Sequence, residues 1–583
     1  MKTSERCALF ALASVLGCSN AGELHPIVAG SASGSTSDSG SEGSTGGTGG
    51  VAVAGLFFVE PFEYHYPDEG TYERVDAGVQ IKLALGEHEP GSFVFVPLEG
   101  VQELVVVPDD LLGPGGTMLP AEMIRVGVVT FMNRSDNAGR TEMVWRSGVE
   151  RGGSSEDSRE FHQDARDRLP LLPGAIVRDA TEAESRMAGA NPSITLTDGI
   201  EARARAVAGQ GVQFWVTVHV PADFELPEPV TSFGGALDLY LDDRKILVPM
   251  RVEVLRTTLD TLEAHGKHVG VMTALEHNDS AFEDAILADL RDHGANALRA
   301  PIATPSGYAP LSDNGIGVVL NLATELEPAD LAAVADAGFA PYLFHGLTEP
   351  SDAEVVEALD AAVSIHDRGG LYADAMAFDV LETIAAQEPV DYWAHAITTY
   401  ELDDTRSSAD FDAFLAHLDA VRSNPRAKIA TMEAHYAEVF AGQAPLQARL
   451  LYGFWLYRSN LDGAVASGYA IADDEAVDNP WTSPSYRGVT FPAIMTDAQG
   501  VELRREMIPT YTWEAMREGI DDFRYALTAA RMIDERGTAG DRETFETLLA
   551  DYGPLYVDGD RVDYRHREAD VRATRYALFD LIA

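Results

Sequence analysis

The sequence predicts a multidomain protein of the β plus α/β class, in which an N-terminal antiparallel β-sandwich is followed by a (β/α)8 barrel of the TIM type with C-terminal helices. Up to residue 257, short runs of β-branched and aromatic residues recur between turn signals, with little helical periodicity. From His268 onward, short apolar runs alternate with amphipathic helices, which is typical of βα units around a parallel sheet. With 583 residues, of which 45% are hydrophobic, the chain is long enough for two full cores.

The first residues predict export. Lys2 and Arg6 precede an apolar stretch at 8–16 that is too short to span a bilayer and is typical of a secretory signal. The stretch ends in a small residue directly before Cys18, as in the bacterial lipobox, whose cysteine is lipidated. An ordinary signal that is cleaved a few residues later is the alternative. We expect 1–18 to be a lipoprotein signal peptide, with Cys18 as the lipidation site.

The cysteine count and the segment after Cys18 agree with an anchored protein. Both cysteines, Cys7 and Cys18, lie in the signal segment, so none remains for a disulfide or a thiolate metal site. Residues 19–52 are rich in Gly and Ser and are expected to form a disordered tether. Ser19, rather than Asp, resembles the outer-membrane sorting pattern. We therefore expect a bacterial cell-envelope protein, either an outer-membrane lipoprotein or one on the extracellular surface.

The net charge limits the partners. The chain has 93 acidic and 43 basic residues and a formal net charge of -50, which repels nucleic acid and anionic lipid surfaces. We expect no nucleic-acid partner, and membrane contact only through the lipid anchor. The negative charge also makes anionic polysaccharides poor candidates for a substrate or ligand, so a neutral glycan is the more favourable one. Because the acidic residues are spread along the chain, a solubilising surface explains most of their excess over the basic residues.

Residues 53–257 are predicted to form the sandwich. Several runs alternate apolar and polar residues, which suits strands covered on one face. Strands are expected at 55–59, 79–85, 92–96, 104–107, 124–131, 212–220 and 245–254. The polar stretch 133–168 is predicted to be a long loop. Disorder is expected over 147–160, because this stretch has few apolar side chains to bury.

Residues 262–583 are predicted to form the barrel and its C-terminal helices. Eight strands are expected, at 269–273, 297–300, 317–322, 340–344, 371–375, 395–400, 428–431 and 462–467. Helices are expected between them at 280–293, 328–337, 352–367 and 408–422. Gly294 and Gly338 follow two of these helices, where C-terminal caps belong. A strong amphipathic helix is predicted at 511–535, and a last helix, 564–582, is expected on the outside of the barrel.

Two adjacent acids, Asp403 and Asp404, follow the sixth predicted strand. A (β/α)8 barrel builds its active site at the carboxyl ends of its strands. Adjacent acids after a strand also occur in solvated loops and at helix N-caps, and the spacing alone leaves both interpretations open.

Four segments carry a resemblance to a known family: WEAMREGIDDFRYAL at 513–527, GVTFPA at 488–493, RLLYGFWLYRSNLDGAVASGYA at 449–470 and QFWVTV at 213–218. The first three are similar to the barrel of glycoside hydrolase family 123 and its relatives described as domain of unknown function 4091. The fourth is similar to a strand of their sandwich. The resemblance extends over most of the chain after residue 53.

The resemblance implies a retaining β-N-acetylgalactosaminidase, in which the acetamido oxygen of the substrate acts as the nucleophile. In the family an Asp-Glu pair ends a barrel strand. Its Asp orients the acetamido group, and its Glu protonates the leaving oxygen. Asp403 and Asp404 stand at these two positions, so the second acid is one methylene shorter than the family's. Glu433, after the next predicted strand, is a further candidate acid, and a solvated helix start is its alternative.

Aromatic residues and one arginine near the predicted strand ends are candidate sugar contacts. They are Tyr400, Trp455, Tyr457, Tyr469, Trp481, Tyr486 and Arg487. A core position is the alternative for Trp455 and Tyr457, because aromatic residues at helical spacing are more often buried. We expect no metal and no cofactor, since neither HExxH nor a phosphate-binding glycine motif is present.

Two functions remain open. The first is a surface-tethered glycosidase that acts on N-acetylhexosaminides. The second is a catalytically impaired glycan-binding or cell-surface scaffold lipoprotein on the same fold. The retained Asp403 favours the first, and the replacement of the family's Glu by Asp404 favours the second.

Overall fold

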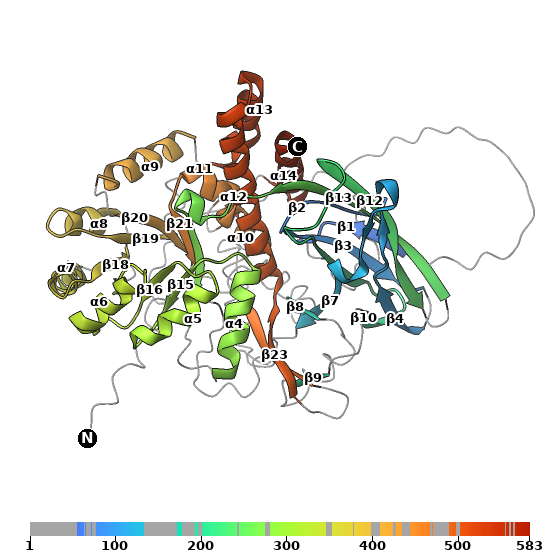
Figure 1. The fold of residues 1–583 in the computed structure, drawn as a ribbon, viewed down its shortest axis with the longest axis horizontal. Coiled ribbons are helices and arrows are strands. Elements are labelled where there is room, and N and C mark those ends of the chain that lie inside the picture. The colour runs from blue at the N-terminus through green and yellow to red at the C-terminus, as the bar shows by residue number, and fades with distance from the viewer. Residues whose placement is uncertain are drawn as a thin grey trace, which may run out of the picture.

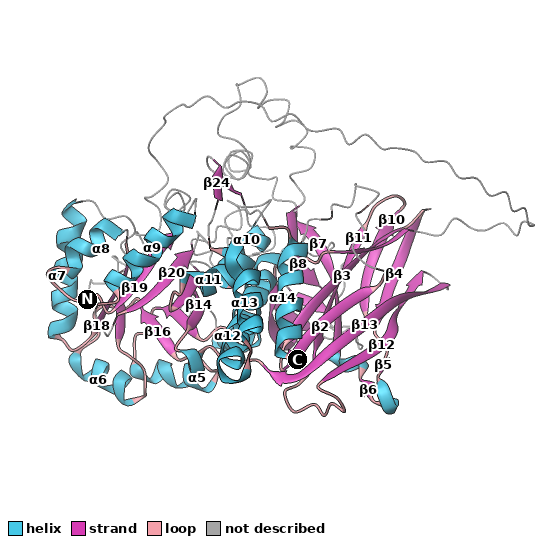
Figure 2. Ribbon diagram, turned by 90° about the horizontal axis from the view of Figure 1, so that it is seen from above, coloured by secondary structure: helices cyan, strands magenta, loops and turns pink. Residues whose placement is uncertain are grey.

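In this computed structural model, two β-sheets and a closed barrel lie on opposite sides of a column of C-terminal helices (Figures 1 and 2). The described residues are 55–62, 65, 72, 77–98, 100–132, 172–177, 193–195, 201–241, 244–273, 280–345, 352–376, 378–397, 408–423, 427–433, 444–466, 469, 489–496, 502–553, 556–558, 561–563 and 566–583. The predicted signal peptide, Cys18, the tether and the loop 133–168 lie outside these ranges.

The two sheets share one hydrophobic core. The first has the order β1 (Gly55–Val59), β3 (His88–Val96), β11 (Val212–His219), β7 (Ile124–Met132), β8 (Leu172–Val177). The second runs β10 (Ala202–Val207), β4 (Val101–Val107), β12 (Val230–Leu241), β13 (Arg244–Thr258), β2 (Val79–Leu85), with β5 (Leu111–Leu112) and β6 (Met118–Leu119) beside β12. Phe93 and Phe214 of the first sheet are buried with Leu239 and Val252 of the second.

The predicted antiparallel pairing is wrong for one pair of strands. All pairs in these two sheets are antiparallel except β2 with β13, which runs parallel from Val79 opposite Met250. These two strands lie far apart in the sequence, so no tight turn forces them to run in opposite directions.

The closed barrel confirms the predicted set of eight parallel strands. They are β14 (His268–Met272), β15 (Ala297–Ala300), β16 (Val318–Asn321), β17 (Tyr342–Phe344), β18 (Leu371–Ala375), β19 (Tyr392–Ile397), β20 (Lys428–Glu433) and β21 (Gly463–Ala466), which pairs back with β14. β19 begins at Tyr392, earlier than predicted, because Tyr392 and Trp393 already pair with β18.

Four helices around the barrel match their predicted positions: α4 (Ser280–Asp292), α6 (Pro328–Asp336), α7 (Asp352–Asp367) and α9 (Ser408–Val421). Four others were not predicted: α5 (Tyr308–Asp313), α8 (Phe378–Ala385), α10 (Ala444–Tyr452) and α11 (Phe454–Ser459). Gly294 and Gly338 end α4 and α6 with φ angles of 73° and 90°, which confirms the predicted caps.

Alternate residues of the barrel strands form two separate cores. Leu320, Tyr342 and Phe344 fill the interior, opposite small residues such as Ala373. Leu298, Val319, Leu343, Trp393 and Ile429 belong instead to the outer core, together with residues of the helices. This alternation lets the sidedness of a strand residue be read from its neighbours.

The described residues after the barrel form two hairpins and three α-helices. The strands β22 (Thr490–Thr496) and β23 (Glu502–Pro509) pair with each other, and β22 also pairs with β9 (Ser193–Thr195). The predicted long helix is α12 (Tyr511–Arg536), whose first turn is capped by Thr510. It is followed by α13 (Ala539–Leu549), a small hairpin of β24 (Tyr556–Asp558) with β25 (Arg561–Asp563), and α14 (Glu568–Ile582).

The expected position of the last helix is wrong. α14 packs against α12 and strand β2 rather than on the outside of the barrel. Arg575 explains this position, because its buried guanidinium lies 2.8 Å from Glu89 of β3 and also contacts Glu518 of α12. An uncompensated buried charge is costly, so the carboxylates and the arginine hold the helix at this position.

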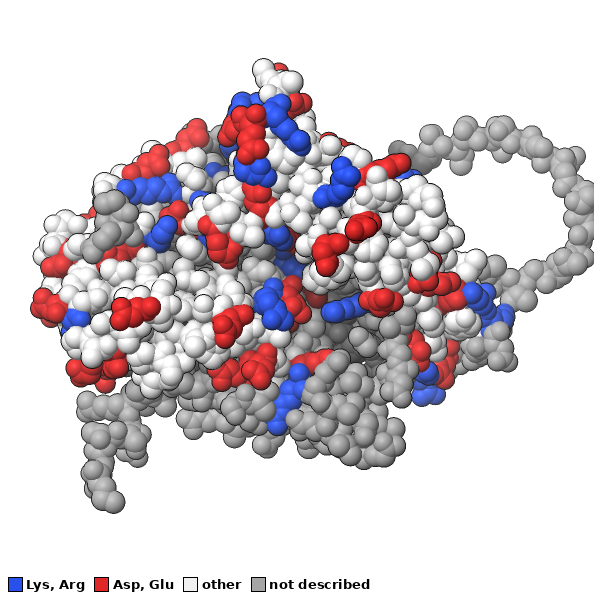
Figure 3. All heavy atoms as spheres, viewed as in Figure 1, with Lys and Arg blue, Asp and Glu red and all other residues white. Residues whose placement is uncertain are grey.

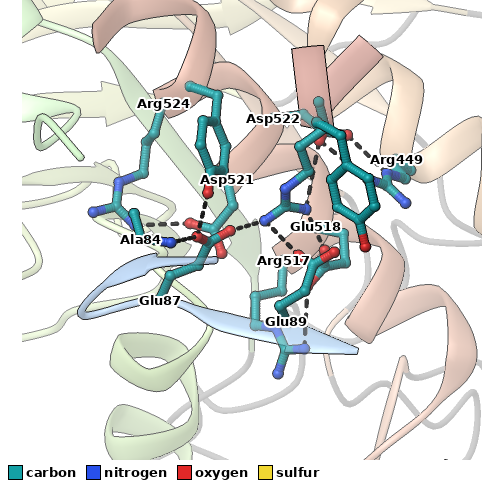
Figure 4. A network of polar contacts seen from close by, with 12 residues as sticks. Ala84, Glu87, Glu89, Arg449, Arg517, Glu518, Asp521, Asp522 and Arg524 are labelled. Atoms are coloured by element: carbon teal, nitrogen blue, oxygen red, sulfur yellow. Dashed lines mark hydrogen bonds and ion pairs between the residues drawn. The ribbon is translucent and has the colours of Figure 1, made fainter. Parts of the chain in front are cut away.

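Charged residues from four parts of the chain meet at this junction (Figure 4). We call them the junction network: Glu87, Glu89, Arg449, Glu518, Asp522, Glu568 and Arg575. All seven side chains are buried. Arg449 of α10 donates to Asp522 at 2.7 Å, and Tyr525 of α12 donates to Glu87 at 2.7 Å. The network therefore ties the first sheet to the helices that follow the barrel.

Acidic and basic side chains are scattered over the face shown in Figure 3, rather than gathered into one patch. Within the described ranges, no helix is both long enough and apolar enough to cross a bilayer.

Candidate active site at the barrel mouth

Charged side chains lie at or next to the carboxyl ends of three barrel strands, β15, β17 and β18, with β16 between the first two. We call the group the mouth cluster: Arg299 of β15, Phe344 and the following His345 at the end of β17, and Asp374 of β18. Because all eight strands are parallel, their carboxyl ends lie at one end of the barrel, which is where (β/α)8 enzymes carry their active sites.

Arg299 faces the barrel interior. Its neighbours Leu298 and Ala300 pack in the outer core, so the side chain between them points inward. The guanidinium carbon lies 3.8 Å from the centre of the Phe344 ring, in a cation–π contact. Burial lowers the pKa of Arg299 to about 10, although Asp374 opposes this shift. The group stays cationic at neutral pH and half-buried, so it can bind oxygen atoms of a ligand.

Asp374 is fully buried and held by hydrogen bonds on both carboxylate oxygens. Tyr372 donates its hydroxyl to Oδ2 at 2.6 Å, and the backbone N–H of Ala375 donates to Oδ1 at 2.8 Å. Burial raises the pKa of Tyr372, and the nearby Asp374 raises it further, so this hydroxyl remains a donor. The strand neighbours of Asp374, Ala373 and Ala375, belong to the interior core and Tyr372 to the outer core, so the fixed carboxylate lies on the helix side of β18 rather than inside the barrel.

His345 lies next to that carboxylate. Its Nδ1 is 3.6 Å from Oδ2 of Asp374, and its backbone N–H donates to the carbonyl of Ala373 at 2.9 Å. The contact with Asp374 raises the pKa of His345 against the opposing effect of burial. The imidazole therefore holds its proton to higher pH than a free histidine, and its charged neighbours, Asp374 and Glu357 of α7, lie on the helix side of the strands.

Most of the residues predicted from the sequence to act on substrate lie outside the described ranges. These are Tyr400, Asp403, Asp404, Trp481, Tyr486 and Arg487. The strand that precedes the acids, β19, is described to Ile397. Glu433 is the last residue of β20, where its backbone pairs with Ile397 and Ala466 at the carboxyl end of the barrel.

The structure corrects the expected sugar contacts of Trp455 and Tyr457. Trp455 is 2% exposed, and its ring centre lies 6.3 Å from that of Phe414 in α9. Tyr457 packs between Phe523 of α12 and Phe545 of α13. Both face neighbouring helices, because helix α11 turns its aromatic side toward the core. Stacking on a sugar needs an open ring face, which a buried indole does not offer.

Tyr469 is also a structural residue, which corrects its expected sugar contact. It is fully buried, its hydroxyl donates to Asp289 of α4, and its ring meets that of Trp513 edge-on at 5.4 Å. Beside it, burial alone would lower the pKa of His293, but Asp289 and Glu514 outweigh burial and raise it to about 10. This group joins α4 to α12 through charged contacts.

A conservative change at Trp455 separates a core role from sugar binding. We expect Trp455→Phe to lower the free energy of unfolding by about 1–2 kcal/mol, because the smaller ring leaves a void. Any affinity for N-acetylgalactosamine, the sugar that the sequence resemblance implies, should stay the same. Chemical denaturation and calorimetric titration of the sugar measure the two quantities. A loss of affinity at unchanged stability would contradict the core assignment.

Sequence reasoning missed Arg299, His345 and Asp374. Each of them lies at or just after the carboxyl end of a predicted strand, at 297–300, 340–344 and 371–375. They share this position in the sequence with Asp403, so the same feature predicts all four residues.

Comparison with known proteins gives a fold but no sequence relative. No family model matches the sequence, and no curated protein matches it. The structure is similar to that of a family 123 glycoside hydrolase from Clostridium perfringens, analysed for glycolipid glycan hydrolysis. The TM-score is 0.60 at 10% identity, over 91% of this chain and 98% of the other. This chain has a glycosidase-like fold.

Two other solved structures have lower TM-scores and add no support to the fold assignment. A family 39 glycoside hydrolase from Bacteroides cellulosilyticus has a TM-score of 0.30 at 10% identity, over 76% of this chain and 82% of that one. A β-glucuronidase from Ruminococcus gnavus has a TM-score of 0.27 at 8% identity, over 74% and 88%. The glycosidase-like fold therefore rests on the likeness that extends over nearly the whole of both chains.

Proposed function

We propose that this protein is a retaining glycoside hydrolase of family 123 type, related to the domain of unknown function 4091 proteins, that acts on terminal N-acetylhexosaminides. The observation that carries the proposal is the structural likeness to a family 123 enzyme over 91% of the chain. Arg299 supports it, since a guanidinium that faces the interior at the carboxyl end of the barrel suits a neutral glycan rich in hydroxyl and carbonyl oxygens.

In this proposal the acetamido oxygen of the substrate attacks C1, so the protein supplies no nucleophile. Asp403 orients and stabilises the acetamido group. Asp404 gives a proton to the leaving oxygen, with Glu433 as the other candidate acid. The Asp404 side chain is one methylene shorter than Glu, which shortens its reach by roughly 1 Å and predicts slow turnover. Tyr400, Trp481, Tyr486 and Arg487 would bind the sugar.

The proposed organisation places the active barrel on a tether. Residues 1–18 would be the signal peptide, with lipidation at Cys18, followed by the tether at 19–52. Residues 53–257 would form a β-sandwich domain and 262–583 the catalytic barrel with its helices. Lipidation would hold the protein at the outer membrane or the extracellular surface, close to glycan substrates.

A second function has one specific observation in its favour. Asp404 stands where the similar enzymes carry Glu. A protein that had lost its proton donor could still bind glycans through the same barrel mouth, as a cell-surface scaffold.

An assay of the full chain, purified in detergent, separates these two functions. We expect it to hydrolyse an aryl 2-acetamido-2-deoxy-β-galactoside or the corresponding glucoside. Asp403→Asn should lower kcat/KM by about 100-fold or more, because the acetamido group loses its charged partner. Asp336→Asn, an exposed acid at the end of α6, is the matched control and should have no effect. Sugar binding without turnover above the Asp403→Asn level would favour the scaffold.

A further inference from the structure

Two histidines of the first sheet stack on each other where that sheet faces the barrel. His88 of β3 lies directly opposite His219 of β11 in the antiparallel ladder. Their ring centres are 3.8 Å apart and their planes differ by 14°. On the same face of β11, Trp215 packs into the core of the barrel, while Phe214 and Val218 face the interior of the two sheets. The pair therefore lies on the face that the sheet turns toward the barrel and its helices.

The hydrogen bond of one ring resembles that of a metal ligand. Nδ1 of His219 lies 3.0 Å from the backbone carbonyl of Glu87. A carbonyl oxygen only accepts, so Nδ1 carries the proton and Nε2 of the neutral ring has a free lone pair. Histidines that bind metal ions almost always donate their other ring N–H in this way, to a backbone carbonyl, a carboxylate or water.

The second ring lies within reach of the same ion. Zinc–nitrogen bonds are about 2.0–2.1 Å long, so two nitrogens on one ion are no more than about 4 Å apart. The 3.8 Å between the ring centres matches this separation. A rotation of the His88 ring about its Cβ–Cγ bond therefore brings one nitrogen of each ring to a single ion, without movement of the backbone.

We propose that His88 and His219 form a binding site for a divalent transition-metal ion that prefers imidazole ligands, such as Cu²⁺ or Zn²⁺. The site lies outside the barrel mouth and does not depend on the proposed glycosidase function. No group of three or more histidine, cysteine or acidic side chains among the described residues could hold a metal ion, so the protein supplies two ligands and water completes the coordination. Both rings are half-buried, so solvent reaches them.

The surroundings keep both rings neutral. Burial lowers the pKa of the two histidines, and the positive charges of Arg517 and Arg125 lower it further. A metal ion therefore does not have to displace a proton at pH 7. Asp292 at the end of α4 and Asp521 of α12 favour positive charge at His219, whereas the two arginines oppose it. The acids and arginines offset each other in part, so the imidazole nitrogens decide the affinity.

The two ligands predict which ions bind. Imidazole nitrogen suits Cu²⁺, Ni²⁺ and Zn²⁺, whereas Mg²⁺ and Ca²⁺ take oxygen ligands. Of these ions, Cu²⁺ binds a given nitrogen site most tightly. We therefore expect Cu²⁺ to bind more tightly than Zn²⁺, and we expect neither Mg²⁺ nor Ca²⁺ to compete. The expectation of no metal came from sequence motifs, which cannot identify two ligands that are distant in the chain.

Titration of the full chain with Cu²⁺ tests the site. The protein is purified in detergent without a histidine tag and is freed of metal with a chelator. Calorimetry should show one tightly bound Cu²⁺, and pulsed electron paramagnetic resonance should show two imidazole ligands. We expect His88→Gln and His219→Gln each to weaken this binding by at least about tenfold, because a lost ligand costs no less than a lost outer-shell partner.

The matched control is His566→Gln. His566 is also half-buried and also stacks on an aromatic ring, that of Tyr552, with the ring centres 4.2 Å apart. Its Nε2 lies 3.1 Å from the backbone carbonyl of Asp551. Because its stacking partner is a tyrosine, it lacks the second imidazole of the pair. The Cu²⁺ affinity of this variant should equal that of the unaltered protein.

Three results would overturn the site and leave the glycosidase function untouched. The first is equal Cu²⁺ affinity in the unaltered protein, His88→Gln and His219→Gln, which would place the ion elsewhere. The second is a loss in only one of these variants, which would show a single ligand. The third is a resonance spectrum of the unaltered protein with fewer than two imidazoles, and this measurement holds even if a variant fails to fold.

Discussion

Replacement of Arg575 by Met is expected to lower the free energy of unfolding by about 3–5 kcal/mol, because it removes the cation with which the buried carboxylates of Glu87 and Glu89 pair. The guanidinium is fully buried and contacts Glu87 and Glu518, with Glu89 at 2.8 Å and Asp522 at 3.5 Å. Thermal and denaturant unfolding of the full chain measure the loss. Methionine keeps much of the volume, so the effect reports charge rather than a cavity.

The control for this change is Arg542→Met. Arg542 of α13 pairs with Asp534, and both side chains are largely exposed, at 47% and 68%. An exposed ion pair is worth little, so the expected change is within about 1 kcal/mol. Similar losses for the two variants would show that the junction network does not depend on the buried charge of Arg575.

The free energy of unfolding is expected to fall by about 2 kcal/mol between pH 6.5 and 8.5. Burial raises the pKa of Glu518 to about 8 and that of Asp522 to about 7, even though nearby arginines oppose the shifts. In the unfolded chain these acids ionise near pH 4. Between the unfolded and folded values the native state holds more protons, so its stability decreases as the pH rises.

Other groups with resolved shifts do not reverse this trend. His293, with its pKa raised to about 10, contributes in the same direction above pH 6.5. Burial lowers the pKa of His88 and His219, so their unfavourable effect on stability disappears as the unfolded chain loses its histidine protons near pH 6.5, at the start of this window. Denaturant unfolding at several pH values gives the slope, and Glu518→Gln should make it shallower. A stability that stays constant or rises over this range would contradict the prediction.

Element positions could be predicted well from local sequence. The strands at 297–300 and 371–375 match β15 and β18 at both ends. Short apolar runs and amphipathic helices alternate with a clear hydrophobic period. This period depends only on residues that are close in the sequence, so it can be recognised without the tertiary structure. The start of β19 was harder to predict, because its pairing with β18 begins at Tyr392, ahead of the predicted start at 395.

The candidate site could be predicted only in part. The order of the parallel strands predicts which residues lie at the carboxyl end of the barrel. For this reason the acids after β19 could be identified as candidates. Which side chains are buried cannot be predicted from the order of the strands in the same way. Trp455 and Tyr469 have the residue types of sugar contacts, yet α9 covers one and α4 accepts a hydrogen bond from the other. Which helix lies against an aromatic ring depends on packing and not on the residues next to it.

By itself the sequence determined the order of strands and helices, the number of barrel strands and the helix caps at Gly294 and Gly338, since periodicity and backbone preference act over a few residues. Only the tertiary structure decided that α14 lies against β2, that Arg575 meets Glu89, and that His345 meets Asp374. The physical reason is that these contacts join positions distant in the chain. Their approach is set by closure of the barrel and by the need to pair buried charges.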